Sequence, residues 1–226
     1  MYTLVKDPNR LNDVFVISDS MMKPHLLQKI IDHIKDDPQA AAALRDRPRI
    51  GKLDLDALHA YPKGTLGHEF AAHMKANNLD PSAIPTEPAE DERAFVHAHL
   101  YETHDVWHAV TGFHTDVAGE LGLQAFYFAQ IPSRLAGTLL TGGLINMMLW
   151  NFDDRERRVE AIARGWTMGR KAKLLLGVRW NELWNEDLGE LRARFGVDAV
   201  RPDEMFVPKE LAVSPDATVQ STAAAA

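Results

Sequence analysis

The segment THDVWHAVTGFHTDVAGE, residues 103–120, places His104, Asp105 and His108 within five positions. Successive residues of an α-helix are about 100° apart, so the two histidines share one face and Asp105 lies within about a quarter turn of them. Two imidazoles and one carboxylate that converge in this way can bind zinc, iron, cobalt or manganese. The other interpretation is a histidine-rich helix whose side chains are exposed or hydrogen-bonded, and the spacing alone leaves both open.

Glu120 can join this donor set only if the chain turns back after the histidines. In an unbroken helix it would lie about 18 Å beyond the second histidine, at about 1.5 Å per residue. Gly112 and the FHTD stretch after it favour a break in the helix. We therefore predict two helices joined by a turn over residues 112–116, and a straight helix there would exclude the metal site.

Helical periodicity covers most of the chain, and no stretch alternates as a strand would. We therefore predict an all-α fold. Helices are expected over residues 24–37, 38–46, 68–79, 92–110, 116–130, 134–151, 153–176 and 180–197. Prolines and glycines predict a turn over 50–67 and a loop over 81–92. We expect one compact helical domain over residues 1–210 and a flexible C-terminal tail over 211–226.

The composition excludes several classes of protein. The 226 residues carry a net charge of −7 and no strong run of Lys or Arg, so we expect no nucleic-acid partner. The chain has no cysteine, which excludes disulfides, thiolate ligands and a cysteine nucleophile. The first residues have neither the apolar core of a signal peptide nor the composition of a transit peptide, which predicts a bacterial-type cytoplasmic protein.

Three stretches together resemble a known family. The order His-Asp-x-x-His, eleven residues and then Glu is similar to the signature of the Coq-four family of ubiquinone (coenzyme Q) biosynthesis proteins. The stretches YPKGTLGHEFAAHM (61–74) and GWTMGRKAKLLLGVRWNELWNEDLGELRARFGV (165–197) extend the likeness to roughly residues 50–200. Because three matches occur in the same order, the resemblance is more specific than the histidine spacing alone.

The resemblance implies an all-helical protein with one divalent metal ion held by His104, Asp105, His108 and Glu120. Zinc is the metal that the family implies, and iron, cobalt, manganese or magnesium stay open. The implied reaction is oxidative decarboxylation and hydroxylation of the ring of a polyprenylated hydroxybenzoate-derived precursor. The alternative is a non-catalytic, lipid-binding scaffold that organises other quinone-pathway enzymes.

An apolar run over residues 135–150 fits a prenylated ligand. It contains sixteen uncharged residues, fewer than the roughly twenty that a membrane span needs, so we expect no transmembrane helix. The run is a buried core helix, or it lines an apolar channel for a prenyl tail or dips into the bilayer interface. The candidate lipid- or substrate-binding residues are Arg134, Leu139, Met147 and Met148.

The same run bears on location and assembly. A prenylated substrate resides in the membrane, so we expect peripheral association with the inner membrane. The apolar run and the amphipathic helix over 154–176 either form a homodimer interface or are buried within a monomer.

Overall fold

The computed structural model describes residues 17, 20–83 and 88–201, and within them it contains helices and no strand. The all-α prediction is therefore confirmed. The helices are α3 (Pro24–Ile34), α4 (Pro38–Asp46), α5 (Leu55–His59), α6 (Leu66–Ala76), α7 (Glu92–Glu102), α8 (His104–Thr111), α9 (Val117–Gln130), α10 (Arg134–Trp150), α11 (Arg155–Lys171) and α12 (Leu188–Phe195). The predicted tail over 211–226 and residues 202–210 of the predicted domain lie outside the described residues.

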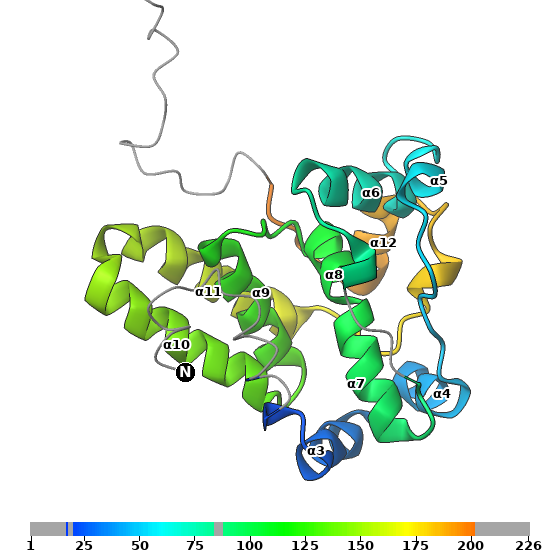
Figure 1. Ribbon diagram of the computed structural model, residues 1–226, viewed down its shortest axis with the longest axis horizontal. Coiled ribbons are helices and arrows are strands. Elements are labelled where there is room, and N and C mark those ends of the chain that lie inside the picture. Colours follow the sequence, from blue (N-terminus) through cyan, green and yellow to red (C-terminus); the bar gives the residue numbers. More distant parts are fainter. Residues whose placement is uncertain (1–16, 18–19, 84–87, 202–226) are drawn as a thin grey trace, which may run out of the picture.

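Helix α9 is central to the packing. It runs along α11 and also contacts α10, while α8 packs against α6, α7 and α12 (Figure 1). A Cβ atom built on Gly165 would lie 1.9 Å from the carbonyl oxygen of Gly122, and one built on Gly169 would lie 2.7 Å from that of Phe126. The two helices therefore approach so closely that only glycine fits at these positions of α11.

The segment 92–110, expected as one helix, forms two. Thr103 separates α7 from α8, and its hydroxyl donates a hydrogen bond of 2.7 Å to the carbonyl of His99. Threonine side chains that bond back to the helix in this way compete with the backbone and bend it. The bend reorients α8 relative to α7, which helical periodicity alone does not predict.

Three other helix boundaries differ from expectation. A short helix, α5, forms within the expected turn 50–67, and the side chain of Asp54 caps it. Helix α11 ends at Lys171 instead of reaching residue 176, because Ala172 adopts an extended conformation. In the last expected helix, only residues from Leu188 onward form an α-helix, after a single 3-10 turn over Trp180–Glu182.

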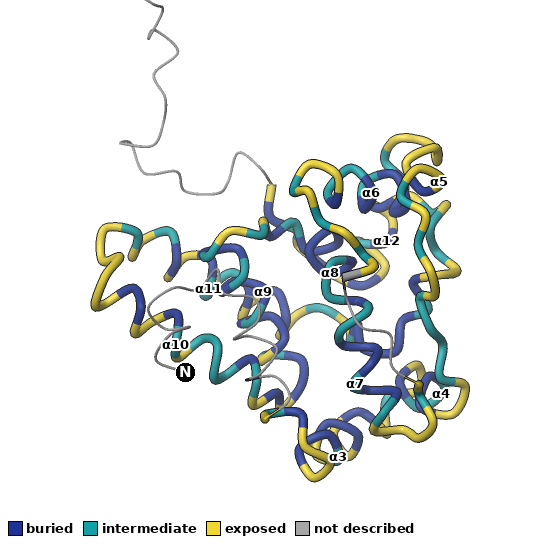
Figure 2. The backbone as a smooth tube through the Cα atoms, viewed as in Figure 1, coloured by how far each residue is buried: buried dark blue, intermediate teal, exposed yellow. Residues whose placement is uncertain are grey.

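The apolar helix α10 is not the buried core helix that the run of apolar residues allows. Its buried residues are Ala136, Gly143, Asn146 and Met147. Large apolar residues in its C-terminal half are exposed: Leu144, Ile145, Met148, Leu149 and Trp150. Figure 2 shows this end of α10 mostly in the colour of exposed residues. Among the described residues, no helix combines the length and apolar character that crossing a membrane requires.

We predict that Gly165→Ala destabilises the protein although alanine is the better helix former. The clash with the backbone of α9 should cost about 1–3 kcal/mol of unfolding free energy, more than the roughly 1 kcal/mol that alanine gains in helix propensity. Gly137→Ala in α10 is the control, because its Cβ would meet only the exposed ring of Phe128, at 3.3 Å. Urea unfolding measures both variants, and equal stabilities would contradict the close packing.

His99 ties α7 to the loop after α11. Its buried Nε2 accepts a hydrogen bond of 3.0 Å from the backbone N–H of Gly177, which requires the neutral ring. Burial, assisted by the charge of Arg49, lowers the pKa of His99 to about 4. This contact therefore gives His99 a structural role.

This pKa predicts a loss of stability in mild acid. An unfolded histidine titrates near pH 6.5, so the stabilisation is complete above that pH and is lost as the pH falls toward about 4. Between about pH 7 and about pH 5 the loss from this group should be about 2 kcal/mol. Urea unfolding of metal-free protein should show a smaller loss for His99→Gln than for the original chain, and an equal loss would refute the assignment.

Candidate metal centre

The turn between α8 and α9 depends on Gly112. This residue ends α8 with a φ of 80°, and a Cβ atom on it would lie 2.2 Å from the carbonyl oxygen of Val200. The new helix begins at Val117, where the side chain of Asp116 accepts a hydrogen bond of 2.8 Å from the N–H of Gly119. The predicted break over residues 112–116 is therefore confirmed, with its physical cause.

The C-terminal end of α8 is held by residues outside α8, α9 and the turn between them. The guanidinium of Arg192 in α12 donates to the carbonyls of Val110 and Ala109, at 2.8 and 2.9 Å. The N–H of Val200 donates to the carbonyl of Thr111 at 2.8 Å. A positive charge at a helix C-terminus also interacts favourably with the helix dipole. These contacts fix the helix that carries both histidines.

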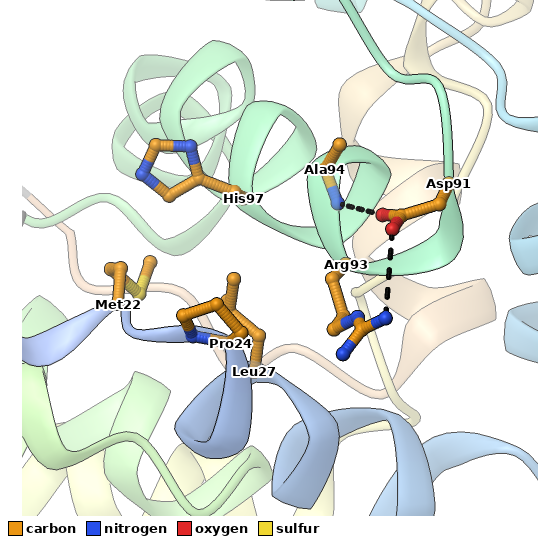
Figure 3. A pocket seen from close by; sticks show the side chains of 7 residues that line it. All are labelled: Met22, Pro24, Leu27, Asp91, Arg93, Ala94 and His97. Carbon is orange, nitrogen blue, oxygen red and sulfur yellow. Dashed lines mark hydrogen bonds and ion pairs between the residues drawn. The ribbon is translucent and has the colours of Figure 1, made fainter.

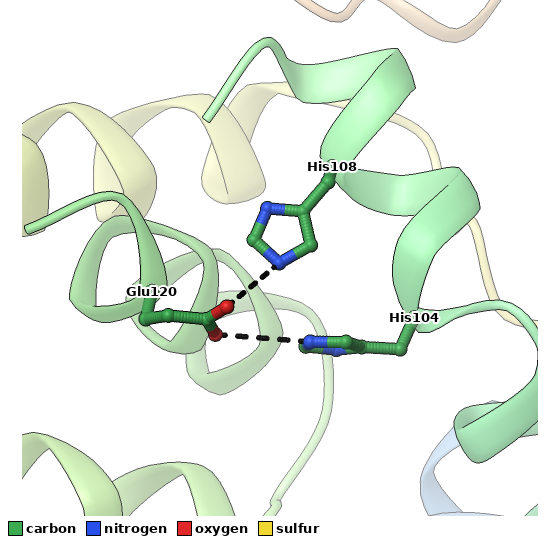
Figure 4. Close-up of side chains that lie close together, drawn as sticks. All are labelled: His104, His108 and Glu120. Atoms are coloured by element: carbon green, nitrogen blue, oxygen red, sulfur yellow. Dashed lines mark ion pairs between the residues drawn. The ribbon is translucent and has the colours of Figure 1, made fainter. Parts of the chain in front are cut away.

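Three of the predicted ligands converge across the turn (Figure 4). His104, His108 and Glu120 each offer a donor atom within 4.8 Å of the other two. Oε1 of Glu120 lies 3.1 Å from Nε2 of His108, and Oε2 of Glu120 lies 3.7 Å from Nε2 of His104. Ligand atoms around a tetrahedral zinc ion are about 3.3 Å apart, given metal–ligand bonds of about 2.0–2.1 Å. The separations therefore fit a metal ion.

The protonation pattern of His108 gives a second test of that fit. Its Nδ1 lies 2.9 Å from the carbonyl oxygen of Phe113, which can only accept, so Nδ1 carries the hydrogen. In the neutral ring Nε2 then holds a lone pair, as a metal ligand must. This buried Nε2 faces Glu120 without an aligned hydrogen bond. Two lone pairs so close repel each other unless a cation or proton lies between them.

The electrostatics of the centre follow from burial and from Glu120. Burial acts to lower the pKa of His108, but the charge and hydrogen-bonding capacity of Glu120, the hydrogen bond to the carbonyl of Phe113 and the charge of Asp105 together outweigh it, and the net shift is upward. Burial likewise acts to raise the pKa of Glu120, and the two histidines reverse that shift. At His104 burial prevails and lowers the pKa. The carboxylate therefore stays ionised and can neutralise part of a cation's charge.

Asp105, the other predicted ligand, is not in the group of three converging residues. It is half-buried on α8 and lies about 100° around the helix axis from His104 and about 60° from His108. Its negative charge nevertheless acts on both His73 and His108. Asp105 is thus a nearby charge whose role as a ligand stays a prediction.

His73 of α6 is a residue of the centre that the sequence pattern did not reveal. Its ring stacks on that of His108, with centroids 5.8 Å apart and planes 17° from parallel. Burial, followed by the charge of His108, lowers the pKa of His73 to about 4, so the ring is neutral near pH 7. A neutral ring supports His108 without repelling a cation. Only the tertiary fold brings the two together, because they are 35 positions apart in sequence.

Tyr127 and Trp107 form another wall of the centre. Tyr127 follows Glu120 by seven residues and so lies on the same face of α9, two turns farther along. Its ring stacks on Trp107 with centroids 4.2 Å apart, and the ring of His104 is nearly parallel to it at 6.1 Å. The sequence predicted a helix over 116–130 and did not single out this hydroxyl.

The predicted lipid-binding residues lie on α10, which contributes none of the three converging ligands. Arg134 and Met148 are exposed, Leu139 is partly exposed and Met147 is buried. A cavity of about 490 Å³ lies elsewhere, between the start of α3 and the start of α7 (Figure 3). Its lining consists of Met22, Pro24, Leu27, Asp91, Arg93, Ala94 and His97. This cavity therefore does not join α10 to the metal centre.

Comparison with known proteins identifies the family. A sequence model of the family described as Coenzyme Q (ubiquinone) biosynthesis protein Coq4 matches residues 2–201. This chain belongs to the Coq4 family. The family match includes the converging residues, and the resemblance seen in the sequence is confirmed.

Individual relatives agree with this membership. A ubiquinone biosynthesis protein coq4 of Aspergillus niger, named as mitochondrial, is 30% identical over 88% of this chain and 68% of its own length. The mitochondrial COQ4 homologue of Rattus norvegicus is 31% identical over 76% of the chain and 66% of its own length. The chain thus spans about two thirds of these proteins.

A solved structure of a similar protein supports the fold described for this chain. A crystal structure from Nostoc punctiforme, provisionally named for ubiquinone biosynthesis, superposes with a TM-score of 0.77 at 30% identity. The alignment covers 88% of this chain and 95% of that one. The arrangement of helices around the centre is therefore shared with a solved member of the same size class.

We predict that purified protein binds one divalent metal ion per chain and that His108→Ala weakens this binding by at least about 100-fold, since it removes a ligand with a preset tautomer. Glu120→Gln should have a similar effect, because it removes the charge that faces both histidines. Metal titration by calorimetry and elemental analysis measure the affinity. His97→Ala, at the distant cavity, is the control. Equal affinity in His108→Ala and His97→Ala would exclude the site.

Proposed function

We propose that this protein acts in ubiquinone biosynthesis as a metal-dependent enzyme. The proposed reaction is oxidative decarboxylation and hydroxylation of the ring of a polyprenylated hydroxybenzoate-derived precursor. The observation that carries the proposal is the convergence of His104, His108 and Glu120 across the Gly112 turn, with Nε2 of His108 buried and lacking an aligned hydrogen bond. The names of the relatives support the pathway.

In this proposal His104, His108 and Glu120 hold one divalent ion, and Asp105 joins them through a change of side-chain conformation. When bound, the ion supplies Lewis-acid polarisation of a substrate carboxylate or phenolate oxygen. Zinc is the first candidate, and the nitrogen and oxygen donors also accept iron, cobalt, manganese or magnesium. The electrons of the oxidation come from the substrate and go to O₂. Zinc does not change oxidation state, so with zinc the ring would react with O₂ directly, whereas a redox-active ion could relay the electrons.

The protein part of the centre is closed on one side and open on the other. His108 is fully buried, whereas the side chains of His104 and Glu120 are 30% and 39% exposed. The neutral ring of His73 and the stacked rings of Trp107 and Tyr127 exclude water from the closed side. A substrate ring would therefore enter from the side of Glu120.

The exposed face of α10 supports a location at a membrane surface. Met148, Leu149 and Trp150 are 59%, 63% and 43% exposed, which is unusual for such large apolar side chains side by side. We propose that this face, with Arg134 and the partly exposed Leu139, meets lipid or the prenyl tail, whereas Met147 is buried and packs beneath it. The protein would then associate peripherally with the inner membrane of a bacterium or of a mitochondrion, and the named relatives are described as mitochondrial.

The second candidate function is a non-catalytic scaffold for other quinone-pathway proteins. The exposed Val159 and Trp166 of α11 extend the apolar surface beyond α10, as a protein interface would, whether with a second copy or with another enzyme. A scaffold needs this surface but needs no turnover at the metal centre. The two functions therefore predict different consequences for the loss of a metal ligand.

The deciding experiment combines turnover with complementation. We expect metal-loaded protein to convert a short-chain prenylated hydroxybenzoate-derived precursor in air, with loss of one carboxyl group and gain of one hydroxyl group by mass spectrometry. His108→Ala should abolish turnover and fail to restore quinone synthesis in deficient cells, whereas His97→Ala should retain both. If His108→Ala restores synthesis and none of the candidate metals supports turnover, the scaffold function is correct.

A further inference from the structure

Buried polar atoms without a protein partner gather around the metal centre. Within the described residues, six buried side-chain nitrogen or oxygen atoms have no hydrogen-bond partner. Four of them belong to residues that form the centre, namely His73, Trp107, His108 and Tyr127. Buried polar groups without partners are rare and costly, so such a cluster points to a bound molecule or ion. The metal ion accounts for Nε2 of His108 and leaves the hydroxyl of Tyr127 unexplained.

The position of Tyr127 is fixed by its neighbours. The residue is 6% exposed, and its ring is held against the indole of Trp107. The backbone of α9 is held in turn by the close contact with Gly165 and Gly169 of α11. The ring therefore cannot swing its hydroxyl out to water without breaking the stack, and the hydroxyl is held inside the protein.

The hydroxyl of Tyr127 can donate a hydrogen bond, because the phenol O–H is a donor. Tyr127 follows Glu120 by seven residues on the same face of α9, and its ring packs against Trp107 and His104 of α8, the helix that carries both histidines. The hydroxyl therefore belongs to the wall of the centre, and its proton is available to an acceptor oxygen of a bound molecule.

We propose that the Tyr127 hydroxyl donates a hydrogen bond to an oxyanion of the molecule bound at the metal centre, a carboxylate or phenolate oxygen of an aromatic acid. This inference rests on the proposed metal site and adds a ligand-contacting residue outside the His-Asp-x-x-His and Glu set. The ring of Tyr127 lies nearly parallel to that of His104, with centroids 6.1 Å apart, so the tyrosine adjoins a proposed ligand of the same ion. Hydrogen bonds to a charged acceptor are stronger than neutral ones, so one hydroxyl suffices to alter affinity.

The effect of Tyr127→Phe on stability distinguishes a tyrosine that contacts a bound molecule from one whose hydroxyl has a structural role. A buried tyrosine whose hydroxyl bonds within the protein loses stability on replacement by phenylalanine, because its partner is left unsatisfied. Here the hydroxyl has no partner among the described residues. Tyr127→Phe keeps the ring stack and removes only the oxygen, so the midpoint of thermal unfolding should stay the same or rise.

The test uses the full chain loaded with Co²⁺, whose visible absorption reports on the centre, and 4-hydroxybenzoate as the probe. We expect the probe to perturb the spectrum of the original protein and to bind Tyr127→Phe about tenfold more weakly, with unchanged Co²⁺ affinity. Tyr101→Phe is the control, because Tyr101 lies on α7 with its ring against His97. This control should bind the probe as the original protein does.

Several outcomes would overturn the inference. Equal probe affinity in Tyr127→Phe and the original protein would do so, as would a lower unfolding midpoint with unchanged probe affinity. If the original protein binds Co²⁺ but not the probe, the oxyanion position does not exist, although the metal centre stands. If the original protein binds no Co²⁺, the proposed function itself fails, and that result is distinct from the others.

Discussion

The reversal of the chain at Gly112 is the constraint on which the centre depends. A residue with a Cβ atom could not lie so close to the carbonyl of Val200, nor adopt a φ of 80° without strain. Because α8 stops there, α9 runs back alongside it, and Glu120 comes to face the two histidines from which a straight helix would separate it. The carbonyl of Phe113, inside the same turn, also sets the tautomer of His108. The one reversal at Gly112 therefore brings Glu120 to the centre and also orients the ring of His108.

Much of this centre follows from local sequence, because the information is local. Helical spacing put His104 and His108 on one face, and a glycine marked the break that brings Glu120 back. His73 could not be predicted in the same way, since its contact with His108 depends on how α6 packs against α8. The hydroxyl of Tyr127 was also missed, because an aromatic residue in an apolar helix is normally core.

The helices, like the centre, could be predicted only where the local sequence decides the structure. Helix positions followed from periodicity, and the larger errors came where a single side-chain contact decides, as in the hydrogen bond from Thr103 to the carbonyl of His99 that bends the chain. For α10, the run of apolar residues could not tell a buried helix from an exposed one, because it is apolar on every side. Its buried positions are small or polar residues, Ala136, Gly143 and Asn146, with Met147. A Cβ atom on Gly143 would lie 2.3 Å from the side chain of Leu121, so the contact with α9 requires a glycine there, and most of the large apolar side chains of α10 stay outside the contact.

The exposed hairpin of α10 and α11 is also tied to the start of the helix that carries Glu120. Arg158 donates to Asn146 of α10 at 2.7 Å and to Asp154 at 2.8 Å, which closes the hairpin. Arg157 binds the same Asp154 and also pairs with Asp116, the residue that caps α9. The N–H of Glu120 donates to the backbone carbonyl of that cap at 2.8 Å. These contacts link α10 and α11 to α9 without interruption, so a shift of α10 and α11 would strain the first turn of α9. The exposed apolar surface of α10 and the metal centre are therefore structurally coupled.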